Sequence, residues 1–496
     1  MSELTDTSTG GTEPVPDRSD GPPVRTDGHD SGLRRGRGSW WWSGLRPLVL
    51  RLHFYVGVFI GPFILVAAVT GLLYTITPQL DQILYRDALH VPVGSSALTL
   101  QEQAGAAAEA VPGGVITQIR PPVGPDSTTR VTFDAPGVAE DYARTAFVDP
   151  YTGEVRAVLD TFGEWLPARA WIDTLHRNLH LGDVGRVYSE LAASWLWVLA
   201  LSGIMLWVIR RRRAARVRRT LLPERSARGR ARLRSWHGAV GLWAALGMLV
   251  LSATGLTWSN FAGSNVGELR SALSWTTPRV SQEISTPDAV SAEPSADPAT
   301  VGALAEEVLA TARAAGMSGP VAITPPDEAA QAWKIAEVTR SWPLQQDAMA
   351  IDPATGQILD TVRFADWPLM AQAAEVGISM HMGILFGVAN QLLLAAVALA
   401  IICVVVWGYR MWWLRRPTRP GATAPGGVQQ PSAGAVALVG LAAIVLGVFF
   451  PLLGVSLVLF LLIDAVRRSR QAPAGPDAGT PGPSEDPAPL GEPAER

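Results

Sequence analysis

The chain contains one pattern of histidines and apolar segments twice. An apolar segment that begins at His53 reaches Thr70-Gly71, and another that begins at His237 reaches Thr254-Gly255. The Thr-Gly pair falls 17 and 18 residues after the histidine in both copies. Such a duplication predicts two equivalent halves, in which residues at matching positions lie at equal depth.

The later part of each copy matches as well. A histidine is followed by glycine at +6 and +27 and by tryptophan at +31, which gives His176, Gly182, Gly203 and Trp207 in one copy and His381, Gly387, Gly408 and Trp412 in the other. Four of the seven histidines therefore occupy repeat-equivalent positions, as two pairs.

The apolar segments are typical of an α-helical polytopic membrane protein. The chain has 496 residues, of which 48% are hydrophobic. Four segments have the length of about 20 residues that crosses a bilayer, namely 54–77, 188–209, 237–259 and 386–409. A fifth, 434–466, is longer than one ordinary span and contains Pro451. We expect two short helices that turn near 449–454, and one long kinked helix is the alternative.

The distribution of charge predicts how the chain crosses the membrane. Residues 210–234 contain 12 Arg and one Glu, whereas residues 78–170 contain 6 Arg against 12 Asp and Glu. The positive-inside rule places the first segment and both termini in the cytoplasm and the second on the outer side. An arginine-rich loop is also typical of nucleic-acid-binding proteins, but between two spans it indicates topology, so the lipid bilayer and not nucleic acid is the expected partner.

The two outer segments share an order of elements. Each is predicted to begin with a short amphipathic helix, at 98–110 and 300–315. The predicted strands are 115–120, 130–134, 144–148 and 154–159 in the first segment and 321–324, 332–338, 347–351 and 357–362 in the second. Asp-Pro-x-Thr-Gly joins the last two strands of each, at 149–153 and 352–356, where Pro fixes φ and Gly accepts a positive φ.

These motifs carry a family resemblance. A small α+β unit that ends in strand, Asp-Pro-x-Thr-Gly and strand resembles the PepSY domain. Two such units between helices that open with Leu52-His53 and Trp236-His237 resemble the PepSY-associated transmembrane family over roughly residues 45–466. The resemblance implies a tandem parallel repeat of four core spans with two small PepSY-like domains outside the bacterial cytoplasmic membrane. The family includes di-haem reductases of ferric siderophores linked to iron uptake, so it also implies metal reduction.

The predicted organisation follows from these segments. It comprises a disordered cytoplasmic tail (1–45), a first span (46–78), a first PepSY-like outer domain (79–170), an outer-face helix with the second span (171–210), a basic cytoplasmic loop (211–235), a third span (236–260), a second PepSY-like outer domain (261–375), an outer-face helix with the fourth span (376–412), a cytoplasmic linker (413–433), a C-terminal helix pair (434–467) and a disordered tail (468–496).

The four repeat-equivalent histidines are the candidate metal ligands. His53 and His237 are expected at the cytoplasmic face, and His176 and His381 at the outer face. Ionisable side chains within a membrane are costly and therefore indicate function. One imidazole from each copy would hold a haem on the symmetry axis, which predicts two haem b groups, one above the other. The alternative is that each histidine is only an amphipathic side chain at the interface.

His180 is an alternative ligand to His176. The two residues are four positions apart, which places them on one helix face and is also the spacing of a metal-binding pair. The equivalent of His180 in the second copy is Leu385, and the resemblance points to Leu175-His176. We therefore predict His176 as the ligand and His180 as a neighbour of the outer haem or of substrate.

Glycines and arginines are expected beside the haems. At 1.5 Å per residue, Gly71 and Gly255 should lie near the outer haem and Gly203 and Gly408 near the inner one. A glycine would let a flat macrocycle approach the backbone, or would only let helices pack closely. Candidates for propionate partners are Arg51, Arg234, Arg177 and Arg186. For Arg51 and Arg234, the favoured alternative is that they only follow the positive-inside rule and anchor the interface.

These features predict a transmembrane electron conduit that reduces an outer acceptor, which the resemblance implies to be a ferric siderophore or ferric iron. Neither a Gly-x-Gly-x-x-Gly after a strand nor a Walker motif is present, and the cytoplasmic loop of about 25 residues is too small for a flavin or nicotinamide domain. The electron donor should therefore be membrane quinol or a partner protein. One alternative is a non-enzymatic membrane module whose PepSY domains bind a protein or peptide. Another is a transporter, although the middles of the first four spans contain no charged residue.

Overall fold

The computed structural model describes residues 38–211, 221–284, 297–328, 330–415 and 433–469. They fall into two units, residues up to Ser43 and residues from Gly44 onward. Within the first unit, residues 38–43 form the beginning of helix α1 (Gly38–Phe59). Helix therefore begins inside the expected disordered tail 1–45. The rest of that tail, residues 212–220 of the basic loop, most of the linker and the residues after 469 lie outside the described residues.

A bundle of apolar helices makes up the membrane-type part. Among the described residues, α7 (Gly182–Arg211), α9 (Gly229–Leu256) and α13 (Gly387–Trp413) are each long and apolar enough to cross a membrane. A fourth candidate span is the bent pair of α1 and α2 (Gly61–Tyr74). Helix α7 packs on α9, α9 on α13, α13 on α2 and α2 on α7, which closes a ring.

The first expected span is not one straight helix, because α1 and α2 meet at 60°. Pro62 lies in the first turn of α2 and has no N–H to donate to the carbonyl of Val58, four residues earlier. The hydroxyl of Tyr409 on α13 donates a hydrogen bond to that carbonyl instead. A backbone break inside an apolar bundle is tolerated when a neighbouring helix satisfies the freed group in this way.

The two segments expected outside the membrane together form one mixed α+β layer. The first contributes α5 (Leu100–Ala110), β1 (Val115–Arg120), β2 (Thr129–Asp134), β3 (Ala143–Val148) and β4 (Val155–Thr161). The second contributes α11 (Pro298–Ala314), β5 (Val321–Thr324), β6 (Trp333–Glu337), β7 (Ala348–Asp352) and β8 (Gln357–Val362). All strands lie within two residues of the positions predicted from the alternation of hydrophobic residues.

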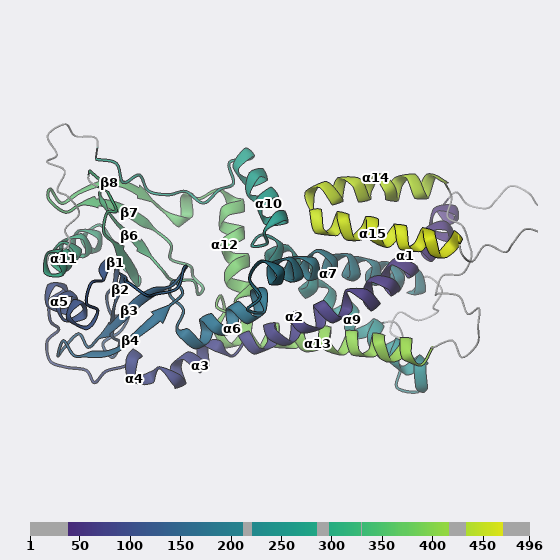
Figure 1. The fold of residues 1–496 in the computed structure, drawn as a ribbon, viewed down its shortest axis with the longest axis horizontal. Coiled ribbons are helices and arrows are strands. Elements are labelled where there is room, and N and C mark those ends of the chain that lie inside the picture. Colours follow the sequence, from purple (N-terminus) through teal and green to yellow (C-terminus); the bar gives the residue numbers. More distant parts are fainter. Residues whose placement is uncertain (1–37, 212–220, 285–296, 329, 416–432, 470–496) are drawn as a thin grey trace, which may run out of the picture. The chain divides into compact units, whose positions relative to one another are not determined.

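The strands join into a single eight-stranded antiparallel sheet of order β4-β3-β2-β1-β5-β6-β7-β8 (Figure 1). The two halves meet where Ile119 of β1 pairs with Ile323 of β5, and both side chains are buried in one core with α5 and α11. Helix α11 approaches α5 so closely that a Cβ at Gly302 would lie 2.5 Å from the carbonyl oxygen of Leu100. The sequence predicts two separate small domains, whereas the described residues form one shared sheet and core.

Short helices connect the sheet with the bundle. They are α3 (Thr77–Leu84), α4 (Arg86–Leu89), α6 (Pro167–Asn178), α10 (Phe261–Ala272), the 3₁₀ turn η1 (Phe364–Asp366) and α12 (Leu369–His381). Helices α6 and α12 follow the last strand of each half and carry His176 and His381 in their last turns. Both then pack near the ring, α6 on α2 and α7 and α12 on α9.

The C-terminal apolar segment forms the helices α14 (Ala433–Phe449) and α15 (Pro451–Ser469), which pack against each other (Figure 1). The chain turns at Phe450, and the backbones approach so closely that a Cβ at Gly454 would lie 2.6 Å from the Cα of Gly447. Helix α15 contacts α7, where the indole of Trp195 donates a hydrogen bond to Ser456 over 2.9 Å.

Candidate functional site

The bundle contains two cavities, and each is lined by one histidine from each copy of the repeat. The first cavity, about 680 Å³, is lined by His53 of α1 and His237 of α9. The second, about 430 Å³, is lined by His176 of α6 and His381 of α12. Both volumes lie in the range of sites that hold a cofactor-sized ligand. The structure therefore brings together the histidines that the repeat pairs.

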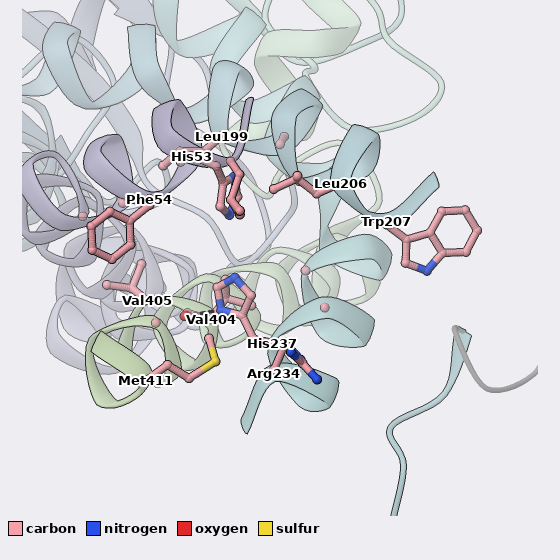
Figure 2. Close-up of a pocket in the computed structure, with 18 of the residues that line it drawn as sticks. His53, Phe54, Leu199, Leu206, Trp207, Arg234, His237, Val404, Val405 and Met411 are labelled. Carbon is pink, nitrogen blue, oxygen red and sulfur yellow. Dashed lines mark hydrogen bonds between the residues drawn. The ribbon is translucent and has the colours of Figure 1, made fainter. Parts of the chain in front are cut away.

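His53 and His237 face each other across the first cavity (Figure 2). Their ring centres are 6.1 Å apart and their planes are at 89°. A metal bound to the Nε2 of a histidine at about 2 Å lies roughly 3 Å from the ring centre, so a metal between two such rings separates their centres by about 6 Å. The observed separation of 6.1 Å is close to the value expected for two histidines that bind one metal.

Hydrogen bonds at Nδ1 fix the tautomer of both rings. The carbonyl oxygen of Val404 lies 2.9 Å from His237 Nδ1 and can only accept, so this nitrogen must carry the proton. Ser202 Oγ lies 2.8 Å from His53 Nδ1 and donates its own hydrogen to the carbonyl of Leu199. The hydroxyl oxygen is therefore left to accept from His53, and in both rings the unprotonated nitrogen is Nε2.

Hydroxyl groups also lie at Nδ1 of both histidines of the second cavity. Thr70 Oγ1 lies 3.0 Å from His176 Nδ1, and Thr254 Oγ1 lies 2.5 Å from His381 Nδ1. Each threonine donates its hydroxyl hydrogen to a carbonyl of its own helix, at 2.9 Å to Val66 and at 2.8 Å to Val250. Both histidines therefore donate from Nδ1, and both Nε2 lone pairs are free.

The four Nε2 atoms have no hydrogen-bond partner among the residues that the structure describes. A metal-binding histidine typically donates one ring N–H to an oxygen, which orients the ring, and leaves its other ring nitrogen for the metal. The described residues contain no group of three or more His, Cys, Asp and Glu side chains that could hold a metal ion. A site built from protein ligands alone needs three or four, so two histidines per cavity fit a metal whose other ligands come from a macrocycle.

The four predicted glycines each lie beside one of these rings. A Cβ at Gly71 would lie 3.0 Å from Cε1 of His176, and the corresponding distances to Cε1 are 3.8 Å for Gly255 and His381, 3.4 Å for Gly203 and His53, and 3.7 Å for Gly408 and His237. Each glycine also lines the cavity of its histidine. A larger side chain at any of these positions would contact the imidazole and fill the edge of the cavity. Close approach to the histidine therefore explains the glycines more specifically than close packing of helices does.

Arginines line both cavities. Arg177 and Arg186 line the second cavity, and Arg186 donates to Asn260 and to the carbonyl of Trp258, both over 3.0 Å. The first cavity is lined by Arg46, Arg210, Arg230, Arg234 and Arg415, and no acidic side chain is among its described lining residues. Arg51, a predicted propionate partner, does not line either described cavity.

His180 lies outside both cavities. Leu179 and His180 both adopt a positive φ of 56°, which ends α6 and turns the chain away from the direction of His176. The His180 ring packs on Trp171 with centres 4.8 Å apart and planes tilted by 34°, and its Nε2 lies 3.1 Å from the carbonyl oxygen of Trp171. The structure therefore groups His176 with His381. His180 is exposed and its ring does not line either cavity.

The second cavity borders the segment that follows the sheet. Phe162 and Trp165, between β4 and α6, are part of its lining. The neighbouring Glu164 lies 3.2 Å from Arg120 and 3.6 Å from Arg340 of the second copy. Burial disfavours its charged form, but Arg340 and Arg120 hold the pKa of Glu164 below its ordinary value. An ion network that joins both copies therefore lies next to this cavity wall.

The hydroxyl residues at Nδ1 were not identified as site residues from the sequence. A signal was present, because Thr70-Gly71 and Thr254-Gly255 are conspicuous in the repeat. Spacing along a chain indicates depth in the membrane, but it does not say which way a threonine points. The sequence also did not indicate which side chains separate the two cavities. Ile64, Leu196 and Ile401 line both cavities.

Residues 50–415 match the family model described as the PepSY-associated TM region, and this range contains all four cavity histidines. No curated protein shows significant similarity to the chain.

Proposed function

This chain belongs to the PepSY-associated TM family, and we propose that it transfers electrons across the cytoplasmic membrane of a bacterium through two haem b groups. His53 and His237 would hold one haem, and His176 and His381 the other. The acceptor is a ferric siderophore or ferric iron on the outer side, so the protein acts as a metal reductase in iron uptake. The donor is membrane quinol or a partner protein on the cytoplasmic side.

The observation that carries this proposal is the facing pair His53 and His237, with ring centres 6.1 Å apart and both Nδ1 atoms engaged. Haem supplies reversible one-electron chemistry at iron when it is bound. Two imidazoles at the iron would leave no position open for oxygen or substrate, so the acceptor would be reduced without binding to the haem iron. The role of the four histidines and their hydrogen-bond partners is to hold the ligand geometry rigidly between redox states.

Electron passage between the two sites is supported by the thin layer that separates them. Ile64, Leu196 and Ile401 each touch both cavities, so one layer of side chains lies between them. These residues are apolar and part of the helix-ring core, which keeps water out of the path. Two haems at successive depths in one bundle would provide a path for electrons across the membrane, whereas a single haem would not span that distance.

The proposed direction rests on charge and on the position of the sheet. The first cavity is lined by five arginines, which the positive-inside rule assigns to the cytoplasmic side. The second cavity borders Phe162 and Trp165, which follow strand β4, so the sheet lies on the outer side in this orientation. A bulky metal chelate would then dock near the sheet, with the second cavity as its nearest electron source.

Haem content and spectrum test this proposal directly. Full-length protein purified from membranes should be red, should contain two haem b per polypeptide by pyridine haemochrome, and should show low-spin ferric spectra typical of two imidazole ligands. The reduced protein should reoxidise on addition of a ferric chelate. A haem content near zero in protein expressed with sufficient haem supply would contradict the proposal.

A further inference from the structure

Each of the four glycines beside a histidine is preceded by a residue at an equivalent position, and in three of the four cases this residue carries a hydroxyl group. Three of the four pairs are hydroxyl-glycine dipeptides, namely Thr70-Gly71, Thr254-Gly255 and Ser202-Gly203. In each, the hydroxyl contacts Nδ1 of the histidine whose Cε1 faces the glycine. One helix turn therefore contacts two neighbouring atoms of the same imidazole, one by a hydrogen bond and the other by close approach.

The carbonyl four residues before the glycine completes the arrangement. Ser202 donates to the carbonyl of Leu199 over 3.1 Å. The hydroxyls of Thr70 and Thr254, which donate over shorter distances to Val66 and Val250, also lie 3.1 Å from the carbonyl of Ala67 and 3.3 Å from that of Leu251, so each hydrogen is shared between two carbonyls. Each hydroxyl thus lies between a ring N–H and this carbonyl. The direction of the hydrogen bonds is fixed, because a carbonyl oxygen only accepts.

The fourth pair differs. Trp407 precedes Gly408, and no hydroxyl is available at that position. His237 Nδ1 instead donates directly to the carbonyl of Val404, which is the residue four positions before this glycine. The carbonyl at this position therefore lies within hydrogen-bond distance of the hydroxyl at three histidines and of Nδ1 itself at the fourth.

We propose that Thr70, Thr254 and Ser202 are positioning residues, which hold each histidine as the Nδ1–H tautomer with Nε2 directed at the bound metal and set the reduction potential of that metal. This inference rests on the proposed haem function. A hydrogen bond from Nδ1 increases the electron donation of the imidazole and stabilises the oxidised metal. Its loss is therefore expected to raise the potential of the haem in that cavity and to weaken haem retention.

Thr254→Val is the most direct test, because valine has nearly the shape of threonine and its methyl group replaces the hydroxyl at Nδ1. We expect a higher midpoint potential for one of the two haems and a loss of haem affinity of about 10- to 100-fold at that site. Thr254→Ser should restore both properties. Ser202→Ala should shift the other haem instead.

Thr257→Val is the matched control, since Thr257 follows on the same helix end and donates to the carbonyl of Thr254 without contacting a histidine. Potentiometric titration and haem retention are measured on full-length protein in detergent. If Thr254→Val behaves like Thr257→Val in a protein that holds two haems, the positioning role is wrong while the haem function stands. Equal shifts of both haems in each variant would indicate general loosening and would also overturn it. Wild-type protein without haem would reject both proposals.

Discussion

Thr254 and His381 are joined by a hydrogen bond of 2.5 Å between the threonine hydroxyl and Nδ1, although they belong to different helices and are 127 positions apart in the chain. The threonine lies near the end of α9, and the histidine ends α12. The contact aligns a long apolar helix with a short helix that follows the sheet. It shows how the repeat builds each site from two distant segments, because neither segment alone could orient the ring.

The histidines are expected to act in pairs. His53→Ala and His237→Ala should each remove the same haem, and His176→Ala and His381→Ala should each remove the other. The reason is that a single imidazole ligand binds haem much more weakly than two. Haem per polypeptide should fall from two toward one in each single variant. Pyridine haemochrome assays and potentiometric titration identify which haem remains.

His180→Ala is the control for this series, since the ring of His180 packs against Trp171 outside the cavities. It should retain two haems with unchanged potentials. Loss of a haem in His180→Ala with retention in His176→Ala would show that the ligand assignment is wrong.

Gly71 is expected to tolerate no larger side chain. A Cβ there would already lie 3.0 Å from Cε1 of His176, and the further methyl groups of Gly71→Val would displace the ring. Overpacking of this kind costs about 1–3 kcal/mol. We expect the variant to lose the haem of the second cavity and keep that of the first. Gly267→Val on α10, where a Cβ meets nothing within 4 Å, is the control.

The bend between α1 and α2 gives a prediction about stability. Tyr409→Phe removes the hydroxyl that donates to the carbonyl of Val58, and an unsatisfied carbonyl in an apolar bundle costs about 1–3 kcal/mol. Pro62→Ala supplies a backbone N–H that can take over this carbonyl. The two substitutions should therefore be coupled, with Tyr409→Phe costing less in the Pro62→Ala background. Unfolding in detergent by denaturant titration measures all four proteins, and strictly additive effects would contradict this explanation of the bend.

The repeat and the alternation of hydrophobic residues were sufficient to predict most elements. The strands lie within two residues of their expected positions because each has one face in a single core, and this burial produces the alternation. Pairing of Ile119 with Ile323 was not predictable, since the sequence does not specify which edge strands meet. Pro62 was visible, but whether a membrane helix bends at proline depends on a partner such as Tyr409 from another helix.

The candidate site was predictable in part, for a similar reason. Spacing after the histidines predicted that Gly71 lies at the depth of the outer haem and Gly203 at that of the inner one, because helical rise converts a sequence interval into depth. In the structure, Gly71 lies beside His176 and Gly203 beside His53. The orientation of side chains around the helix axis was not predictable across helices. The hydroxyls of Thr70 and Ser202 therefore became functional candidates only when their distances to Nδ1 were known.

Asp81 on α3 should make stability depend on pH. Burial raises the pKa of its carboxyl from 3.8 to about 6, and one of its oxygens has no hydrogen-bond partner among the described residues. The folded state therefore binds more protons than the unfolded state between about pH 4 and pH 6, so this contribution to stability is lost as pH rises through about 6. Asp81→Asn should be more stable than wild type at pH 7.5, by no more than about 2 kcal/mol, and the difference should shrink toward pH 4. A difference that does not change with pH would exclude titration of Asp81 as the cause.

The direction of electron transfer is the most decisive prediction. The first cavity is lined by Arg234 and four further arginines, while the second borders Trp165 beside the sheet. If the arginine side faces the cytoplasm, a membrane-impermeant ferric chelate should be reduced only when it is on the sheet side and the reductant is on the arginine side. Right-side-out and inside-out vesicles, with orientation determined by protease access to the sheet, separate the two arrangements. His176→Ala should abolish reduction even if the haem of the first cavity remains reducible, since that haem lies one side-chain layer farther from the acceptor. Equal rates in both orientations, or full activity in His176→Ala, would reject the directional mechanism.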